Sequence, residues 1–381
     1  MILGFDAKRF FHNKTGLGNY SRDLIRILAH YYPDNSYLLY NPKPKKIDRI
    51  QIDGKIIIEK LPIKIFNKKI PALWRLFKIN KQIKVDNVSI FHGLSGEIPI
   101  GLNKSGIKTV ATIHDLIFMR YPKLYTLIDC KIHYYKFKYA ANNADLVITI
   151  SEQTKRDVIK YLKIKPEKIK VIYQGCSPVF KEEISSVFLE ITRKKFNLPS
   201  KFILNVGTIE KRKNILSAIK AIKDIDTKLV IIGKKTVYYN EIIKYIFENK
   251  IEEKIIFLED VALKELAAIY RMAQIFIYPS IFEGFGIPII EALYSKTPVI
   301  TTRGGCFTEA GGKDSIYVDS LNISEIGNEI YNLLENPEKQ EIMKTKGFEF
   351  VQQFNDDIIA SNLINSYNVV IKLPKKLNLN L

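Results

Sequence analysis

Cysteine is scarce in this sequence of 381 residues, and long apolar runs are missing from it. The three cysteines, Cys130, Cys176 and Cys306, are scattered without the paired spacing of a zinc site or a disulfide framework. No stretch approaches the roughly 18 apolar residues of a membrane-spanning helix, and charges begin at Asp6, before a signal peptide could form its apolar core. These absences predict a cytoplasmic protein in a reducing compartment.

Acidic residues are also few, since 40 Asp and Glu residues stand against 59 Lys and Arg residues, for a formal net charge of +19. Residues 42–84 carry over half of this excess, with 13 basic residues against three acidic ones. Trp74 and Phe77 lie among these lysines. Such a mixture fits an interfacial surface attracted to anionic lipid. No helix-turn-helix, zinc-finger or RNP-type signature supports nucleic acid as a partner. The alternative is a Lys-rich composition spread over a solvated surface.

The chain alternates short apolar strands with amphipathic helices, which predicts α/β domains built on parallel sheets. Its length suits two Rossmann-like domains, with a cleft between them as the expected ligand site. The expected strands are 1–5, 37–40, 109–113, 146–150, 202–206, 229–232, 255–258, 274–279 and 298–301. The expected helices are 19–31, 152–163, 215–225 and 263–273, and Ser151 is the expected N-cap of the second of these.

The domain boundary is expected between residues 173 and 199, where Gly175 and Pro178 interrupt the periodicity. We assign residues 1–180 to an N-terminal domain and residues 181–354 to a C-terminal domain. Residues 355–381 form a C-terminal helix and tail.

Two carboxylates, Glu283 and Glu291, stand eight residues apart around a glycine-rich turn. Pro288 suits the first turn of a helix, so Glu283 is expected in the loop and Glu291 about one turn inside the helix. Gly284 and Gly286 let a ligand approach the backbone closely, and the helix N-terminus presents free N–H groups. The stretch predicts a site for an anion or for sugar hydroxyls. The alternative is a surface loop followed by an ordinary helix.

Two further loops offer groups that can bind phosphate. Gly16 and Gly18 open a helix, but Ser21 stands where a dinucleotide fingerprint needs its third glycine, which disfavours an NAD enzyme. A helix that opens at glycines still makes a backbone phosphate site. Arg212 and Lys213 lie between a strand and a helix, where they can neutralise a diphosphate.

His114 and Asp115 follow an apolar strand. The histidine can hydrogen-bond a sugar hydroxyl, and Asp115 can fix its tautomer or accept a bond from an acceptor hydroxyl. His92 also lies beyond an apolar run and could line the acceptor side. For both histidines, a position without a functional role is the alternative.

Taken in order, these motifs resemble those of retaining GT-B glycosyltransferases of family four. The stretch from Glu283 to Glu291 is similar to the family's E-x7-E motif, and residues 206–214 resemble its "VGT-x-E-x-RKN" segment. The resemblance extends from Phe5 to about residue 336 and is weakest over residues 42–84. Near Glu309, Thr308 stands where many relatives carry Pro, so we assign Glu309 no catalytic role.

The resemblance implies a GT-B fold: two Rossmann-like domains facing a central cleft, with a C-terminal helix that crosses back to the first domain. The first domain would bind the acceptor and the second the nucleotide-sugar. The implied catalytic residues are Glu283, His114 and Asp115. The implied donor-binding residues are Gly16, Gly18, Thr208, Arg212, Lys213, Gly284, Phe285, Gly286 and Glu291, the last of them at the ribose.

The implied activity is transfer of a sugar to the hydroxyl of a lipid-linked or surface-polysaccharide glycan, with retention at the anomeric carbon. GDP-mannose is the first candidate donor, and a UDP- or dTDP-sugar is the alternative. No metal or other cofactor is expected, because the cations and helix ends of the site can take the place of a metal. The resemblance leaves open whether retention proceeds by same-face attack or through a carboxylate nucleophile. The expected location is peripheral, at the inner face of the cytoplasmic membrane.

Overall fold

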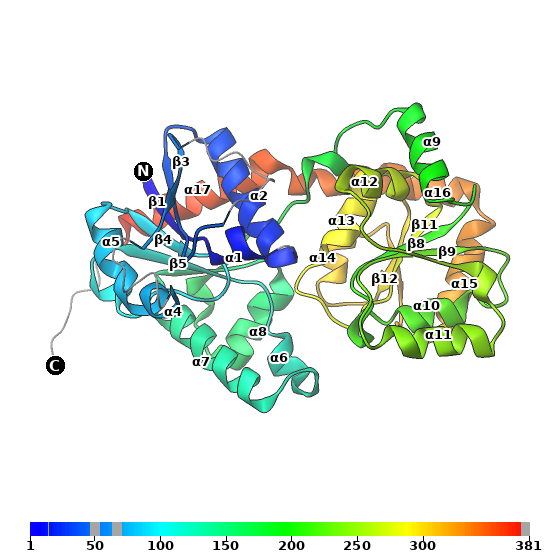
Figure 1. Cartoon of the computed structure of the whole chain (residues 1–381), viewed down its shortest axis with the longest axis horizontal. Coiled ribbons are helices and arrows are strands. Elements are labelled where there is room, and N and C mark those ends of the chain that lie inside the picture. The colour runs from blue at the N-terminus through cyan, green and yellow to red at the C-terminus, as the bar shows by residue number, and fades with distance from the viewer. Residues whose placement is uncertain (14, 46–53, 63–70, 375–381) are drawn as a thin grey trace. The chain divides into compact units, whose positions relative to one another are not determined.

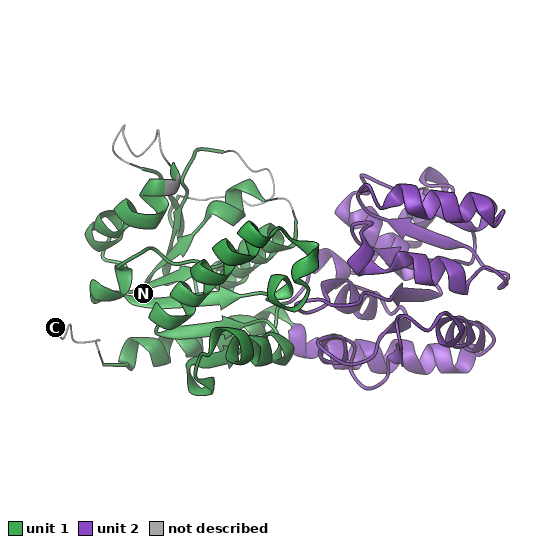
Figure 2. Ribbon diagram, turned by 90° about the horizontal axis from the view of Figure 1, so that it is seen from below, with its two compact units in different colours: residues 1–174, 355–381 green, residues 175–354 purple. Residues whose placement is uncertain are grey.

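The protein folds as two compact units (Figure 2). The computed structural model describes residues 1–13, 15–45, 54–62 and 71–374. The first unit comprises Met1–Gln174 together with Asn355–Leu381, and the second comprises Gly175–Phe354. Within the described residues, no helix is long and apolar enough to cross a membrane.

The first unit is built on a parallel sheet, whose seven strands in the described residues run in the order β3-β2-β1-β4-β5-β6-β7 (Figure 1). The strands are β1 (Ile2–Asp6), β2 (Ser36–Tyr40), β3 (Ile57–Lys60), β4 (Ile90–Gly93), β5 (Lys108–Ile113), β6 (Leu146–Thr149) and β7 (Ile169–Val171). Every strand pair is parallel. The expected parallel architecture is therefore confirmed, and β3, β4 and β7 add to the strands predicted from sequence.

Both faces of this sheet are covered because successive strand side chains point to opposite sides. In β2, Tyr37 and Leu39 join one core with the helices α2 (Gly16–Tyr31) and α17 (Asp356–Lys372). Leu38 and Tyr40 join the opposite core with α5 (Ile79–Val85). Other helices of this unit are α1 (Lys8–His12), α4 (Pro71–Leu73), α6 (Ile117–Arg120), α7 (Leu127–Asn143) and α8 (Glu152–Leu162).

The C-terminal helix α17 packs on the first unit, as the GT-B resemblance implies. Tyr367 is fully buried, and its hydroxyl lies 2.7 Å from Nδ1 of His92 on β4. At the start of the helix, Asp356 pairs with Arg26 of α2 at 2.7 Å. The chain thus leaves the first unit, builds the second and returns.

The second unit repeats the design with six described strands in the order β10-β9-β8-β11-β12-β13. They are β8 (Ile203–Val206), β9 (Leu229–Ile232), β10 (Ile255–Leu258), β11 (Ile275–Tyr278), β12 (Val299–Thr302) and β13 (Ile316–Val318). One face packs on α10 (Ile215–Ala221), α11 (Tyr239–Glu248) and α15 (Ile323–Leu334). Buried residues of the other face meet α12 (Leu263–Met272), α13 (Ile287–Tyr294) and α14 (Phe307–Gly311). The helices α9 (Ser186–Lys195) and α16 (Pro337–Val351) complete the unit.

Each sheet has one point where the chain order reverses, between β1 and β4 in the first unit and between β8 and β11 in the second. In open parallel sheets, ligands bind outside the carboxyl ends of the strands at this point. In the second unit the loops that leave it are residues 207–214, after β8, and residues 279–286, after β11. These two loops contain most of the predicted donor-binding residues.

Candidate active site

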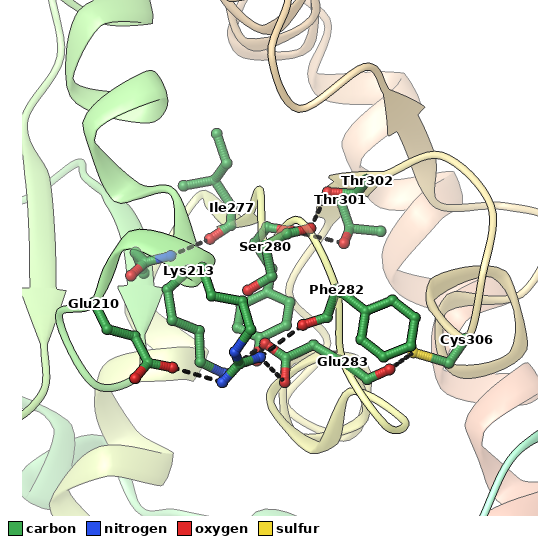
Figure 3. Close-up of polar contacts among 12 residues, drawn as sticks. Glu210, Lys213, Ile277, Ser280, Phe282, Glu283, Thr301, Thr302 and Cys306 are labelled. Atoms are coloured by element: carbon green, nitrogen blue, oxygen red, sulfur yellow. Dashed lines mark hydrogen bonds and ion pairs between the residues drawn. The ribbon is translucent and has the colours of Figure 1, made fainter. Parts of the chain in front are cut away.

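At the reversal point of the second sheet, three predicted residues lie together, although they come from two loops that are distant in the sequence (Figure 3). One carboxylate oxygen of Glu283 pairs with Arg212 Nη1 at 2.8 Å, and the other oxygen pairs with Lys213 Nζ at 2.7 Å. All three side chains are less than one-fifth exposed. Because β8 and β11 are neighbours, residues 70 apart in sequence form one cluster.

Tyr278 at the end of β11 completes the cluster. Its hydroxyl accepts a bond from Lys213 Nζ at 2.6 Å and donates to Glu283 Oε1 at 3.1 Å. Burial alone would raise the pKa of Glu283, but Lys213 and Arg212 outweigh this effect and hold that pKa below its ordinary value. Burial disfavours the charged form of Lys213. Tyr278 and Glu283 stabilise that form more strongly, so the pKa of Lys213 is raised. The site therefore holds one carboxylate and two cations near neutral pH.

Side chains from outside both loops hold the cluster in place. Thr301 and Thr302 donate to the carbonyls of Tyr278 and Ser280 at 2.8 and 2.6 Å, and Cys306 Sγ donates to the Glu283 carbonyl at 3.2 Å (Figure 3). Sequence reasoning missed these three supports. Two threonines at the end of an apolar strand are too common a pattern to have identified them.

Asn214 joins the two loops and was also missed as a functional residue. Its backbone is left-handed, with φ of 53°, a conformation that Asn adopts more readily than most residues. Its side chain donates to the carbonyls of Ser320 at 2.6 Å and Pro279 at 3.3 Å. The end of the basic loop is thereby fixed against the loop that carries Glu283.

The helix α13 begins where Gly286 and Pro288 predict. Gly286 has φ of +126°, a conformation that L side chains rarely adopt. Gly284 lies in the same turn, and Phe285 is buried with its ring 5.4 Å from that of Phe354. Phe285 can therefore offer a donor its backbone, while its side chain anchors the loop.

Glu291 lies about one turn into α13, apart from the charged cluster. Its Oε2 accepts the hydroxyl of Tyr270 on α12 at 3.1 Å. Burial raises the pKa of Glu291 to about 7, and the bond from Tyr270 opposes only part of that rise. The two glutamates of the motif thus have opposite electrostatic settings: Glu283 is charged at neutral pH, while Glu291 titrates near it.

The glycine-rich start of the basic loop is packed tightly. Gly207 has φ of +153°, and a Cβ atom on Gly233 would lie 1.8 Å from the Gly207 carbonyl oxygen. Thr208 follows and is exposed. The Lys213 side chain passes within 4 Å of the place that a Cβ on Gly207 would occupy. Gly233 is required by the close approach of the Gly207 carbonyl, whereas Gly207 is favoured by its backbone conformation.

The remaining predicted residues belong to the first unit. Gly16 starts α2 and is exposed, whereas Gly18 is packed so closely that a Cβ would lie 1.9 Å from the Asn13 carbonyl oxygen. The Gly18 N–H already bonds the carbonyl of Thr15 at 2.9 Å. The predicted helix starts at Gly16, three residues earlier than expected from sequence.

His114 lies at the carboxyl end of β5 and is held neutral. Its Nε2 donates to the Leu94 carbonyl at 2.8 Å, so Nδ1 is left as the acceptor atom of the ring. Burial lowers its pKa to about 4. Asp115 Oδ1 accepts the backbone N–H of Ile117 at 3.0 Å, at the start of α6. The Leu94 carbonyl thus determines the tautomer of His114.

His92 does not line a binding surface, so the alternative of a position without a binding role holds for it. It is 1% exposed, and its Nδ1 and Nε2 bond the hydroxyls of Tyr367 and Thr112 at 2.7 and 2.8 Å. Burial lowers its pKa to about 3. This histidine ties the returning helix α17 to the sheet.

The basic segment 42–84 requires a correction. Trp74 is 1% exposed and belongs to the core under α5, so it cannot insert into lipid. Arg75 is also buried and pairs with Asp6 and Glu97 at 2.6 and 2.7 Å. Phe77 is 47% exposed. The remaining basic positions in this segment include Lys46, Arg49, Lys64, Lys68 and Lys69, which lie outside the described residues.

Two parallel-sheet domains, with an acidic and basic cluster at the reversal point of the second, match the GT-B architecture that the sequence motifs imply. Comparison with known families agrees: residues 16–179 match "Glycosyltransferase Family 4" and residues 188–350 match "Glycosyl transferases group 1". The chain belongs to this glycosyltransferase family.

Two similar proteins are named as O-antigen mannosyltransferases. The "O-antigen chain mannosyltransferase B" of Escherichia coli is 23% identical, over 97% of this chain and all of that protein. The "O-antigen chain mannosyltransferase RfbU" of Salmonella typhimurium is 28% identical, over 70% of this chain and 72% of that protein.

Solved structures share the fold at low identity. A glycosyltransferase from Rickettsia africae matches with a TM-score of 0.75 and 17% identity, over 98% of this chain and 99% of that one. Anabaena HepE, solved in complex with UDP-glucose, matches with a TM-score of 0.75 and 17% identity, over 97% of this chain and 99% of that one.

Proposed function

We propose that the protein is a retaining, metal-independent hexosyltransferase that uses GDP-mannose and acts on a hydroxyl of a lipid-linked or surface-polysaccharide glycan. The names of the two O-antigen mannosyltransferases support the choice of sugar and product. The observation that carries the proposal is the cluster of Arg212, Lys213 and Glu283 at the reversal point of the second sheet.

The two cations suit the charge that develops during transfer. As the glycosidic bond of the donor breaks, negative charge builds on the β-phosphate of the leaving nucleoside diphosphate. Arg212 and Lys213 are held by Glu283, Tyr278 and the Phe282 carbonyl, so they can stabilise this charge with little reorganisation. Two fixed cations supply the positive charge for which other transferases use a divalent metal, and this supports metal independence.

The setting of Glu283 favours a positioning and electrostatic role over a nucleophilic one. A carboxylate bonded to two cations and a phenol hydroxyl is a weak nucleophile, because attack would require it to give up these contacts. Same-face attack, with the departing phosphate taking the proton of the acceptor hydroxyl, needs no such loss. The smaller loss of contacts around Glu283 supports retention by same-face attack.

Glu291 would bind the ribose hydroxyls of the donor, with Tyr270 holding the carboxylate in place. In the first unit, His114 would accept a bond from a sugar hydroxyl at Nδ1, and Asp115 would lie beside the acceptor. The N-terminal turn of α2, with Gly16 and Gly18, would face the diphosphate.

The donor nucleotide has a second candidate. Anabaena HepE was solved with UDP-glucose, so UDP-sugars compete with GDP-mannose, and dTDP-sugars are the third class to test. We further propose that the protein acts in the cytoplasm, at the inner face of the membrane, because a chain of net charge +19 is attracted to anionic lipid.

The test is release of nucleoside diphosphate from a panel of GDP-mannose, UDP-glucose and dTDP-rhamnose, with and without EDTA. We expect the largest release from GDP-mannose and no effect of the chelator. The anomeric configuration of the product, read by NMR, should equal that of the donor. Loss of activity in EDTA with recovery on adding Mg²⁺ or Mn²⁺ would contradict metal independence, and an inverted product would contradict retention.

A further inference from the structure

Three contacts hold His114 in place at the carboxyl end of β5. Its Nε2 donates to the Leu94 carbonyl at 2.8 Å, and its own carbonyl accepts Thr154 Oγ1 at 3.0 Å. The third contact is with the ring of Tyr20 on α2, whose centroid lies 4.5 Å from that of the imidazole, with the two planes at 89°. Aromatic rings prefer this edge-to-face arrangement, so Tyr20 favours one orientation of the imidazole.

The same tyrosine is anchored to β5 through its hydroxyl. The Tyr20 hydroxyl oxygen lies 3.2 Å from Thr112 Oγ1. Thr112 and His114 are two residues apart, and side chains at this spacing along a strand point to the same face of the sheet. Tyr20 therefore spans both residues: its hydroxyl is bound at Thr112, while its ring covers the imidazole of His114.

This anchor continues into the core as a chain of buried hydrogen bonds. Thr112 Oγ1 lies 2.8 Å from Nε2 of His92, whose Nδ1 lies 2.7 Å from the hydroxyl of Tyr367 on α17. Within the described residues the fully buried Tyr367 hydroxyl bonds only His92, so it donates to Nδ1, because a buried donor without an acceptor is costly. Nε2 of His92 then carries the ring proton and donates to Thr112, and the buried Thr112 hydroxyl donates to Tyr20. The core of the first unit thus determines where Tyr20 lies.

The groups around His114 keep its imidazole neutral. Burial is the largest influence and lowers the pKa of His114 to about 4, the bond to a backbone carbonyl opposes part of this shift, and Arg9 of α1 lowers the pKa further. His92 of β4 is itself neutral, because burial lowers its pKa to about 3, and Asp115 is the next residue along the chain. The uncharged ring of Tyr20 is part of the cover that excludes water from the imidazole, and burial of this kind disfavours its charged form.

We propose that Tyr20 is a positioning residue for His114 in sugar binding: it fixes the plane of the imidazole and shields it from water, so that Nδ1 remains an acceptor for a sugar hydroxyl. The inference rests on the proposed function, in which His114 accepts a bond from such a hydroxyl. An acceptor nitrogen must carry no proton, because both nitrogens of an imidazolium are donors. Tyr20 therefore preserves this contact at mildly acidic pH, where a histidine with the ordinary pKa of about 6.5 loses it.

The first test removes the ring and follows His114 directly by NMR, with its signal assigned by its loss in His114→Gln. In Tyr20→Ala, water reaches the imidazole, so the pKa of His114 should rise from about 4 toward the ordinary value of about 6.5. Tyr20→Phe keeps the ring and loses only the hydroxyl, so its titration should stay close to that of the unchanged chain. If circular dichroism shows that Tyr20→Ala does not fold, Tyr20→Gln removes the ring while it fills part of the same volume, and the same rise is expected.

The second test links this shift to sugar binding through the pH profile of nucleoside diphosphate release. For Tyr20→Ala, kcat/KM divided by that of the unchanged chain should be about fivefold to tenfold lower at about pH 5.5 than at about pH 7.5, because the neutral fraction of an imidazole with a pKa near 6.5 falls by about that factor. The quotient removes the titration of Glu291, which both chains share. At about pH 7.5 the loss should be only about 2- to 10-fold, the usual contribution of one aromatic pair. Release without glycan uses water as the acceptor, so a fall at low pH seen there places the hydroxyl on the donor sugar, and a fall seen only with glycan places it on the acceptor.

A matched control is Tyr31→Ala, because Tyr31 makes an equivalent contact on the same helix: its ring lies 4.8 Å from that of His30, also at 89°. This pair lies at the other end of α2, so the variant should leave the quotient independent of pH. A His114 pKa that stays near 4 in Tyr20→Ala, or a quotient for that variant that does not change with pH, would overturn the inference. Failure of the proposed transferase would be seen separately, as no nucleoside diphosphate release from any donor at any pH, and the NMR titration would still report whether Tyr20 keeps His114 neutral.

Discussion

Replacing Glu283 with Gln tests the charge balance on which the proposed site depends. The amide has nearly the same size as the carboxylate and can accept one bond from Lys213 or Arg212. It carries no charge, so two cations that are each less than one-fifth exposed lose their common counter-ion. The variant thus changes electrostatics and donor positioning while it leaves the packing of the loop almost intact.

The expected magnitude follows from this burial. Removing one partner of a fully buried ion pair costs about 3–5 kcal/mol, and the partial exposure of these side chains reduces the cost to about 1–3 kcal/mol. For a unit of this size each kcal/mol lowers Tm by about 2–4 °C. Turnover should fall at least about 100-fold, the usual cost of losing a key polar group at a reacting centre.

The assay is release of nucleoside diphosphate at saturating donor, together with calorimetric donor binding and a thermal melt. Glu210→Gln is the matched control, because Glu210 also pairs with Arg212, at 2.6 Å, but its side chain is 38% exposed. A surface pair contributes about 0–1 kcal/mol, so this variant should stay within about fivefold of normal turnover. If Glu283→Gln turned over within tenfold of the unchanged protein, the central role given to this carboxylate would be refuted.

Four further predictions follow from the site. Arg212→Ala or Lys213→Ala should weaken binding of a nucleoside diphosphate more than binding of the nucleoside, because the lost contact is charge-assisted; equal losses by calorimetry would contradict their role at the phosphates. Because the pKa of Glu291 is raised to about 7, its carboxylate gains charge as pH rises through neutrality. Nucleoside affinity should therefore rise several-fold between about pH 6 and about pH 8, and Glu291→Gln should bind more weakly with a flat pH profile; a pH dependence retained in that variant would assign it to another group. The same raised pKa means that the contribution of Glu291 to the free energy of unfolding is largest at low pH and declines as pH rises from about 4.5 to about 7, which denaturant melts of the chain and of Glu291→Gln would show. Gly233→Ala should destabilise the second unit by about 1–3 kcal/mol, because its Cβ would lie 1.8 Å from a carbonyl oxygen; Gly16→Ala, with open space around its Cβ, should melt like the unchanged protein.

The sequence determined the elements of the fold closely where strands are short, apolar and bounded by turns. The strands predicted at 229–232 and 255–258 coincide with β9 and β10, and the helix predicted at 263–273 ends one residue earlier. Ser151 caps α8 as expected, accepting the N–H of Thr154 at 3.0 Å. These features depend on local backbone preferences and on the apolar pattern of strands buried in a parallel sheet. Both are determined by residues that are close together in the sequence.

The sequence also placed the two glutamates correctly relative to their helix. Pro288 and the glycines before it mark the start of α13, so Glu283 falls in the loop and Glu291 one turn into the helix. Local chemistry was sufficient here, because proline fixes the backbone angle of a first turn and glycine permits the φ of +126° that precedes it.

Only the tertiary structure decided which of these groups meet. Strand order places β8 beside β11, and this alone brings Arg212 and Lys213 to Glu283 across 70 residues. Burial also decided the roles of two side chains that the sequence could not assign. Trp74 lies in the core and not among the exposed lysines, and His92 links the sheet to α17.

The exposed side of α7 was equally invisible in the sequence. Apolar, aromatic and basic residues alternate throughout this helix, so its pattern does not show which side faces the core. That side is decided by where the sheet ends and where Ala140 and Ala141 let the helix approach it. Packing partners that are distant in the chain set the exposure of each side chain, and neighbouring residues do not encode them.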